Sequence, residues 1–159
     1  MDKAVLLQAI IERLEADLQG LVAAANAARA EATDAESKQE GRYDMRGQLA
    51  AYLAAGQAKL AAELAEAIAA YRVLRPIKLP PEAAAAIGAL VTLESQNRRT
   101  HYFIGPARGG TDIDLAGETV TLVTAASPLG RQLLGCRAGN LVTLPGPKSG
   151  QTQTVLRIE

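Results

Sequence analysis

A seven-residue spacing of apolar side chains near the N-terminus constrains the fold of this chain more than any other feature. Leucine, isoleucine and alanine recur at alternating steps of four and three, at positions 7, 11, 14, 18, 21, 25, 28, 32 and 35. A helix returns to the same face every seven residues, so this spacing is that of the inner seam of two packed helices. The seam changes from leucine to alanine toward residue 35, which predicts a helix pair that is thinner at that end. Asp2 can cap the first turn.

A second helical segment begins near Asp44. Leucine or alanine stands at 53, 60, 67 and 74, with position 56 or 57 and positions 64 and 71 completing the seam between them. An antiparallel arrangement of the two segments would bring large side chains together at one end and small ones at the other. We therefore predict an antiparallel coiled-coil hairpin over residues 1–75, with its tip at about 34–44. At 1.5 Å per residue, each arm would be about 45 Å long.

The sequence RPIKLPPE at 75–82 ends the helical pattern, because proline cannot continue a helix. Residues 76–87 are rich in proline and alanine and are predicted to be a linker. Within them, the alanine-rich stretch at 82–87 predicts a helical turn.

From residue 88 onward, apolar and polar residues alternate with a period of two. Five such runs, at 90–95, 100–105, 118–124, 140–146 and 152–159, are bounded by glycine, proline, asparagine or aspartate. Between the third and fourth runs, Ser127 can cap a helix, Pro128 suits its first position and Gly135 can end it. The sequence therefore predicts an α+β protein, in which the hairpin precedes a small antiparallel β-sheet domain with one short helix at 88–159.

Composition excludes several classes of function. The chain carries 17 basic and 17 acidic residues, which argues against nucleic-acid binding through net charge. With one histidine and one cysteine, we predict no disulfide, no intrinsic metal site and no cofactor. His101 is expected to be a half-exposed strand residue and Cys136 a small packing or surface residue. Apolar runs fall short of the roughly 20 residues of a membrane span. The amphipathic N-terminus does not resemble a signal peptide, so we expect a soluble cytoplasmic protein without a membrane partner.

The stretch DAESKQEGRYD at 34–44 is predicted to form the tip, and nearly all of its residues are polar. Its acids are Asp34, Glu36, Glu40 and Asp44. Carboxylates bind Mg²⁺ through oxygen, so a tip carrying them could complete a metal site in a partner that supplies the other ligands. The alternative is a solvated turn whose charges pair locally, at under about 1 kcal/mol per pair.

The motif SPLGRQLLGCRAGN at 127–140 resembles the signature of the Gre family of bacterial transcription elongation factors, S-P-[IL]-[AG]-R-A-L-[IL]-G-K-x-x-G-D. Matching residues are Ser127, Pro128, Leu129, Gly130, Arg131, Leu133, Leu134, Gly135 and Gly139, whereas Gln132, Cys136 and Asn140 differ. The resemblance implies an FKBP-like C-terminal domain that docks at the rim of the secondary channel of RNA polymerase. It implies that residues 127–131 make this contact and that the coiled coil enters the channel.

The tip departs from the usual family pattern D-x-x-E-N-x-E-Y. Aligned on Tyr43, Glu36 takes the place of the first acid, but Gln39 and Arg42 stand at the other two. The tip is closer to that of a Gre-like subgroup, E-S-x-x-E-x-x-Y-D-[TM]-R, which it matches at Glu36, Ser37, Glu40, Tyr43, Asp44 and Arg46. The resemblance implies that Glu36, Glu40 and Asp44 assist a Mg²⁺ ion shared with the polymerase, and that Tyr43 and Arg46 orient the tip.

The resemblance implies an accessory factor and not an enzyme: a monomer that binds RNA polymerase, modulates elongation and acts indirectly on the 3′ end of the nascent RNA. In one reading it stimulates transcript cleavage in backtracked complexes. The missing second acid at Gln39 favours the alternative of a channel binder that regulates or inhibits transcription without cleavage. Two further alternatives are a coiled-coil interaction protein and a prolyl isomerase. The second would need an aromatic pocket, for which the sheet domain offers only Tyr102 and Phe103.

Overall fold

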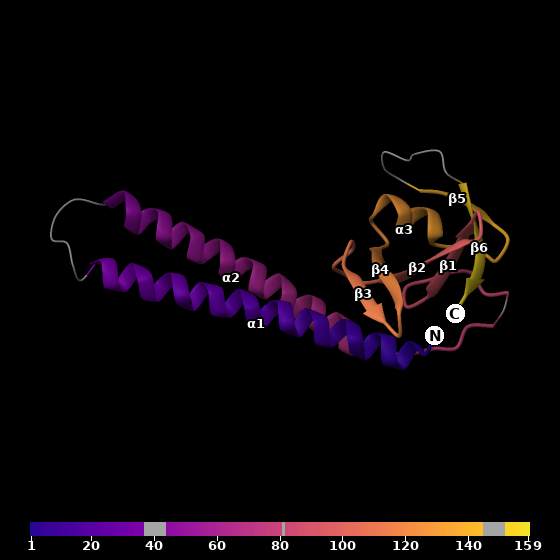
Figure 1. Cartoon of the computed structure of the whole chain (residues 1–159), viewed down its shortest axis with the longest axis horizontal. Coiled ribbons are helices and arrows are strands. Elements are labelled where there is room, and N and C mark those ends of the chain that lie inside the picture. Colours follow the sequence, from indigo (N-terminus) through magenta and orange to yellow (C-terminus); the bar gives the residue numbers. More distant parts are fainter. Residues whose placement is uncertain (37–43, 81, 145–151) are drawn as a thin grey trace. The chain divides into compact units, whose positions relative to one another are not determined.

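The computed structural model describes residues 1–36, 44–80, 82–144 and 152–159, with side chains outside 31–51. The chain forms two compact units, one made of Met1–Ile11 with Ala70–Glu159 and the other of Glu12–Ala69. Two long helices, α1 (Lys3–Glu36) and α2 (Asp44–Arg72), precede the strands and one short helix, α3 (Pro128–Leu133) (Figure 1). The predicted α+β class, with an N-terminal pair of helices, is confirmed.

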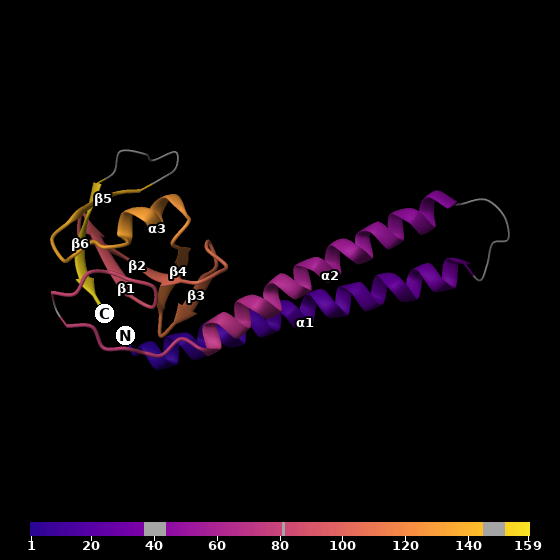
Figure 2. The same ribbon diagram turned by 180° about the vertical axis from the view of Figure 1, so that it is seen from behind.

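In the unit Glu12–Ala69 the two helices lie side by side in both views (Figures 1 and 2). Burial along α1 follows the predicted seam as far as Ala25, because Leu14 is buried and Leu18 and Leu21 are half-buried, whereas Ala28 is exposed. The predicted seam of α2 is wrong at two positions, since Leu53 and Leu60 are 56% and 50% exposed. The inward positions of α2 are 54, 57, 61, 64, 67 and 68, so the seam is confirmed at 57, 64 and 67. Alanines occupy both the buried and the exposed face of this helix, so the spacing of apolar residues alone did not show which face is buried.

The unit made of Met1–Ile11 and Ala70–Glu159 contains a six-stranded sheet with the order β3-β4-β2-β1-β6-β5. The strands are β1 (Leu90–Ser95), β2 (Arg98–Gly105), β3 (Asp112–Leu115), β4 (Glu118–Thr124), β5 (Leu141–Thr143) and β6 (Thr152–Ile158). The prediction of an antiparallel sheet is wrong for one pair, because β2 and β4 run parallel and the sheet is mixed. Alternation shows which face a side chain occupies, but it does not show the direction of the neighbouring strand.

Strand β3 was not predicted. It is four residues long, and aspartates occupy two of its positions while Ile113 is its buried residue. A two-residue turn joins it to β4, with φ angles of 53° at Ala116 and 83° at Gly117. Positive φ at both central positions is typical of the hairpin turn whose twist matches that of the strands. The pairing with β4 therefore stabilises a segment whose composition is unfavourable for a strand.

The predicted helical turn at 82–87 is also wrong, because none of these residues is helical. Backbone hydrogen bonds tie the segment to the end of α3 instead. Ala85 N donates to Cys136 O and Gly135 N donates to Ala85 O, both at 2.8 Å. Tertiary hydrogen bonds have replaced the local ones that a helical turn would need.

Two sets of buried side chains flank the sheet. On the α3 side, Leu129 and Leu133 join a core cluster with side chains of β1, β2, β4, β5 and β6. Elsewhere in the same unit, the ring centroids of Tyr71 and Phe103 are 6.4 Å apart, and both rings are fully buried. The Tyr71 hydroxyl donates to Ala107 O at 2.8 Å. Burial raises the pKa of Tyr71, and the hydrogen bond to Ala107 opposes this in part.

The first turn of α1 is capped as predicted, because Ala4 N donates to Asp2 Oδ1 at 2.8 Å. In the same turn, Lys3 is buried and its Nζ donates to Gly88 O at 3.2 Å. Burial lowers the pKa of Lys3, while the Glu159 carboxylate opposes that shift. Among the helices in the described part of the chain, none is both long and apolar enough to cross a membrane.

Candidate functional site

The motif at 127–140 that resembles the Gre signature contains α3 and its N-cap. Ser127 has extended backbone angles, and its Oγ accepts from Gly130 N at 3.0 Å while donating to Thr124 O at 2.8 Å. Pro128 occupies the first helical turn, where its missing N–H is not needed. The predicted N-cap is therefore confirmed. A six-residue helix depends strongly on such a cap, because nucleating a helix is unfavourable.

Close packing explains why residue 130 of this motif is glycine. A Cβ atom at Gly130 would lie 1.8 Å from Thr124 O, which is inside van der Waals contact. Leu129 and Leu133 are 7% and 0% exposed and pack on the sheet. These three residues hold α3 against β4, so their side chains are not available to a partner.

Among the five residues 127–131, the exposed ones are Pro128 and Arg131. The Arg131 guanidinium donates through Nη1 to Ala126 O at 2.9 Å, which holds it beside the start of the helix. Of the five residues predicted to dock on the polymerase, Pro128 and Arg131 thus present their side chains most fully to solvent.

Two departures from the family signature have structural partners. Gln132 makes two hydrogen bonds with the backbone of Thr143 in β5, with Nε2 donating at 2.9 Å and Oε1 accepting at 3.1 Å. Cys136 is half-buried against the core cluster, and its Sγ donates to Gln132 O at 2.8 Å. The substitutions therefore connect α3 to the sheet, and Cys136 is the packing residue that was predicted.

Three of the predicted tip residues lie at the ends of the two long helices. Glu36 is the last residue of α1, Asp44 is the first residue of α2, and Arg46 is in its first turn. Glu40 and Tyr43 lie outside the described residues. The roles given to these five residues stay predictions.

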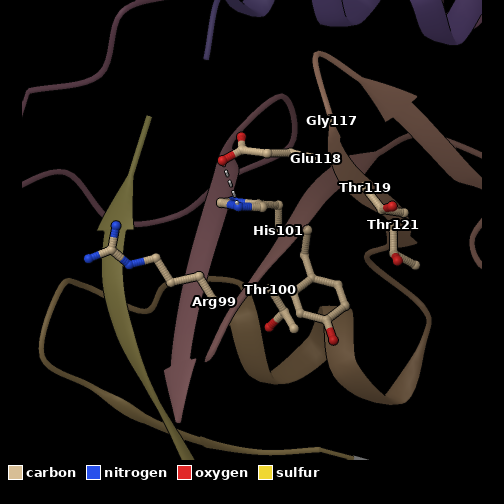
Figure 3. A pocket seen from close by; sticks show the side chains of 8 residues that line it. Arg99, Thr100, His101, Gly117, Glu118, Thr119 and Thr121 are labelled. Carbon is tan, nitrogen blue, oxygen red and sulfur yellow. Dashed lines mark ion pairs between the residues drawn. The ribbon is translucent and has the colours of Figure 1, made fainter. Parts of the chain in front are cut away.

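A pocket of about 480 Å³ lies where β2 and β4 diverge (Figure 3). The parallel pairing of these strands begins at His101 and Val120, and the pocket extends across its first residues, since the paired Tyr102 and Thr121 both line it. It is lined by Arg99, Thr100, His101, Tyr102, Gly117, Glu118, Thr119 and Thr121. The sequence did not predict this site, because its two sides meet only through the parallel pairing.

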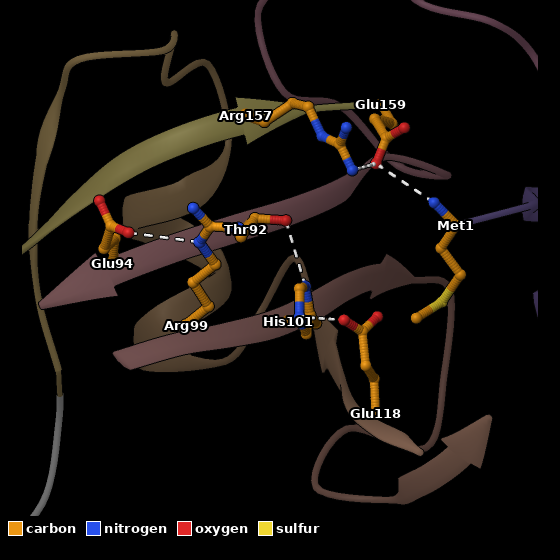
Figure 4. A network of polar contacts seen from close by, with 8 residues as sticks. All are labelled: Met1, Thr92, Glu94, Arg99, His101, Glu118, Arg157 and Glu159. Carbon is orange, nitrogen blue, oxygen red and sulfur yellow. Dashed lines mark hydrogen bonds and ion pairs between the residues drawn. The ribbon is translucent and has the colours of Figure 1, made fainter. Parts of the chain in front are cut away.

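His101 is fixed between two neighbours at this pocket. Its Nδ1 is 3.1 Å from Thr92 Oγ1, and its Nε2 is 3.8 Å from Glu118 Oε1 (Figures 3 and 4). The side chain is 15% exposed. The expected strand position of His101 is confirmed, but its side chain is less exposed than predicted, and the sequence did not predict its contact with Glu118.

Several other charges pair near His101 (Figure 4). Arg99 Nε is 3.2 Å from Glu94 Oε1, and Arg157 Nη2 is 2.7 Å from Glu159 Oε2. The N-terminal amine of Met1 lies 3.9 Å from the same Glu159 oxygen. Within the described ranges, no group of three or more histidine, cysteine or acidic side chains is placed to hold a metal ion.

Comparison with known proteins gives matches among solved structures. No family model and no curated protein sequence matches the chain. The chain is similar to the GreA factor homolog 1 (Gfh1) of Thermus thermophilus, with 19% identity, 94% of both chains covered and a TM-score of 0.40. The Gfh1 of Thermus aquaticus gives 20% identity over 96% of this chain and 95% of that one, with a TM-score of 0.40.

A further match is a transcription elongation factor GreA/GreB from Nitrosomonas europaea, with 24% identity and a TM-score of 0.37. It covers 65% of this chain and 78% of that one. The structural neighbours of this chain are thus Gfh1 and GreA/GreB factors, of the Gre-like family that its motif at 127–140 resembles.

Proposed function

We propose that this protein is a divergent Gre-like accessory factor that binds bacterial RNA polymerase and modulates transcript elongation. The observation that carries the proposal is the motif at 127–140, which forms a capped helix on a sheet in a chain that begins with two long helices. In this proposal, residues 1–75 act as the part that enters the secondary channel. The FKBP-like part at 88–159 docks at its rim, and residues 76–87 connect the two.

The lengths of the helices suit such a role. The 34 residues of α1 and the 29 residues of α2 correspond to about 51 and 44 Å at 1.5 Å per residue. A helix pair of this length can carry charges far from its own base. Glu36, Glu40 and Asp44 would then assist a Mg²⁺ ion at the polymerase active centre, where carboxylate oxygens are suitable ligands. Tyr43 and Arg46 would orient the tip.

Docking at the rim would use the exposed side of α3. Pro128 and Arg131 are its accessible motif residues, whereas Ser127, Leu129 and Gly130 support the helix from within. We therefore propose that Pro128 and Arg131 contact the polymerase directly. The other three residues would only hold α3 in position.

The tip is tested with a purified backtracked complex of RNA polymerase and 3′-labelled transcripts. If the protein stimulates cleavage, short 3′ fragments appear in the presence of Mg²⁺ and are reduced by Glu36→Ala and by Glu40→Ala. Glu63→Ala is the matched control, because Glu63 is an exposed acid within α2 whose ion pair with Lys59 at 3.9 Å lies away from the tip. Absence of shortened RNA would contradict the cleavage role.

The non-cleaving alternative is favoured by Gln39, which stands where the usual pattern has an acid. It predicts a changed yield of full-length transcript without shortened RNA, and competition with a cleavage-stimulating Gre factor for the polymerase. If the protein neither shortens RNA nor competes, both forms of the proposal are wrong.

Docking is tested separately by measuring affinity for the polymerase together with thermal stability. Arg131→Glu should weaken binding without lowering the melting temperature, because Arg131 is exposed. Ser127→Ala should lower the melting temperature, since it removes the cap of α3 at about 1 kcal/mol. Arg98→Glu, an exposed arginine at the start of β2, is the control and should leave both quantities unchanged.

A further inference from the structure

The hairpin formed by β3 and β4 is strongly acidic. Asp112, Asp114 and Glu118 are all exposed, and residues 111–126 include no lysine or arginine. Asp112 and Asp114 accept hydrogen bonds from neutral donors, the hydroxyls of Thr121 and Thr119, each at 2.6 Å. Among the described residues, none of the three carboxylates forms an ion pair with lysine or arginine. Asp112 and Asp114 therefore have no ion-pair partner among the described residues, and Glu118 lies 3.8 Å from His101 Nε2.

These carboxylates stand next to the pocket. Asp112 is paired in register with Thr121, and Thr121 with Tyr102, so the three residues follow one another across β3, β4 and β2. Neighbouring strands are about 4.8 Å apart, which puts the backbone of Asp112 about 10 Å from the strand that carries Tyr102. Thr119 and Thr121 line the pocket, and they donate hydrogen bonds to Asp114 and Asp112. These two aspartates therefore lie just beyond the edge of the pocket that β4 forms.

Tyr102 supplies a fixed aromatic wall for this pocket. Its ring is half-buried and packs against the core cluster beneath α3, which limits its movement. In the part of the chain that the structure describes, its hydroxyl has no hydrogen-bond partner. An aromatic face next to Asp112 and Asp114, which have no ion-pair partner among the described residues, favours a cation with an apolar stem.

We propose that the pocket and the acidic β3–β4 hairpin bind an arginine side chain presented by a protein partner. The stem of the arginine would lie along the Tyr102 ring, and its guanidinium would donate to the carboxylates of Asp112 and Asp114. A planar guanidinium offers several donors in a fixed geometry, which suits two carboxylates two residues apart on one strand. This site does not depend on the function proposed above.

The remaining charges of the pocket are consistent with this ligand. Arg99 also lines the pocket, but its Nε is paired with Glu94 at 3.2 Å. Glu118 faces His101 at 3.8 Å and adds negative charge on the same hairpin. Nucleic-acid phosphates would be repelled by these carboxylates, so the hairpin is assigned to a basic protein segment.

The test uses the full chain labelled with ¹⁵N and two small probes. N-acetyl-arginine amide represents an arginine within a protein, and N-acetyl-citrulline amide has nearly the same shape without the charge. The arginine probe should produce saturable shifts of the amide resonances of residues 99–102 and 117–121. These shifts should weaken as salt is added, because exposed charges are screened. Equal shifts with the citrulline probe would overturn the proposal.

Charge-removing variants complete the test. Asp112→Asn and Asp114→Asn keep an oxygen acceptor for the threonine hydroxyls, and each should weaken binding of the arginine probe about two- to five-fold. Glu63→Gln removes an exposed acid from α2 and should leave binding unchanged. Unaltered binding by the Asp112→Asn, Asp114→Asn double variant, with its spectrum still dispersed, would show that the site is wrong. Tighter binding of free arginine than of the capped probe would contradict a protein source.

Discussion

The contact between Gly105 and Tyr71 gives the sharpest test of the packing in the sheet unit. A Cβ atom at Gly105 would lie 2.0 Å from Tyr71 Oη, 2.8 Å from Cζ and 3.1 Å from Cε1. Tyr71 is fully buried beside Phe103, and its hydroxyl is bonded to Ala107 O, so the ring has little room to move. Gly105→Ala should therefore displace the ring and break this hydrogen bond.

The expected cost follows from two contributions. Forcing an extra methyl group into a packed core costs about 1–3 kcal/mol, and leaving a buried polar group without its partner costs about 1–3 kcal/mol. We expect Gly105→Ala to lower the free energy of unfolding by about 3 kcal/mol. Tyr71→Phe alone loses the hydrogen bond and should cost about 1 kcal/mol. In the Tyr71→Phe background the nearest clashing atom is absent, so Gly105→Ala should cost less there, by about 1–2 kcal/mol.

Urea denaturation, followed by circular dichroism and by hydrogen exchange of the Ile104 amide, would measure these differences. The Ile104 amide donates to Ala89 O at 2.9 Å and therefore reports on the sheet unit itself. Gly20→Ala is the control, because a Cβ there would meet no atom within 4 Å. That change should stabilise α1 by about 0.5–1 kcal/mol. If the costs of Gly105→Ala and Tyr71→Phe simply add, the proposed clash is not the cause.

Three further predictions follow from single contacts. Gly130→Ala would place a methyl group 1.8 Å from Thr124 O, so we expect the free energy of unfolding to fall by more than about 2 kcal/mol and the melting temperature to fall with it. An unchanged melting temperature would contradict the packing of α3. Ala116→Gly should raise stability by about 1 kcal/mol in urea denaturation, because Ala116 has φ of 53°; destabilisation would argue against this turn. Burial raises the pKa of Tyr71 above its ordinary value of 10.0, so its contribution to stability is present below pH 10 and is lost as pH rises further. Above pH 10 the wild-type protein should lose up to about 1.4 kcal/mol per pH unit more than Tyr71→Phe, and parallel pH profiles would refute this.

Some elements could be predicted because their signals are local. The seam of α1, the Asp2 and Ser127 caps and the alternation of five strands depend on residues only a few positions apart. The same holds for the motif at 127–140, which is continuous in the chain. For such elements the periodicity of the backbone translates spacing directly into structure.

Other features depended on contacts between distant residues. The sequence by itself determined two long helices, alternating strands and a capped helix with a family-like motif. Only the tertiary structure decided which face of α2 is buried, that β2 and β4 run parallel, and that β3 exists. The pocket at Tyr102 and the contact between Tyr71 and Gly105 likewise join segments that no local pattern connects. Alternating residues do not determine whether neighbouring strands run parallel or antiparallel, and heptad spacing in an alanine-rich helix does not determine which face is buried. The packing of side chains from distant segments determines both.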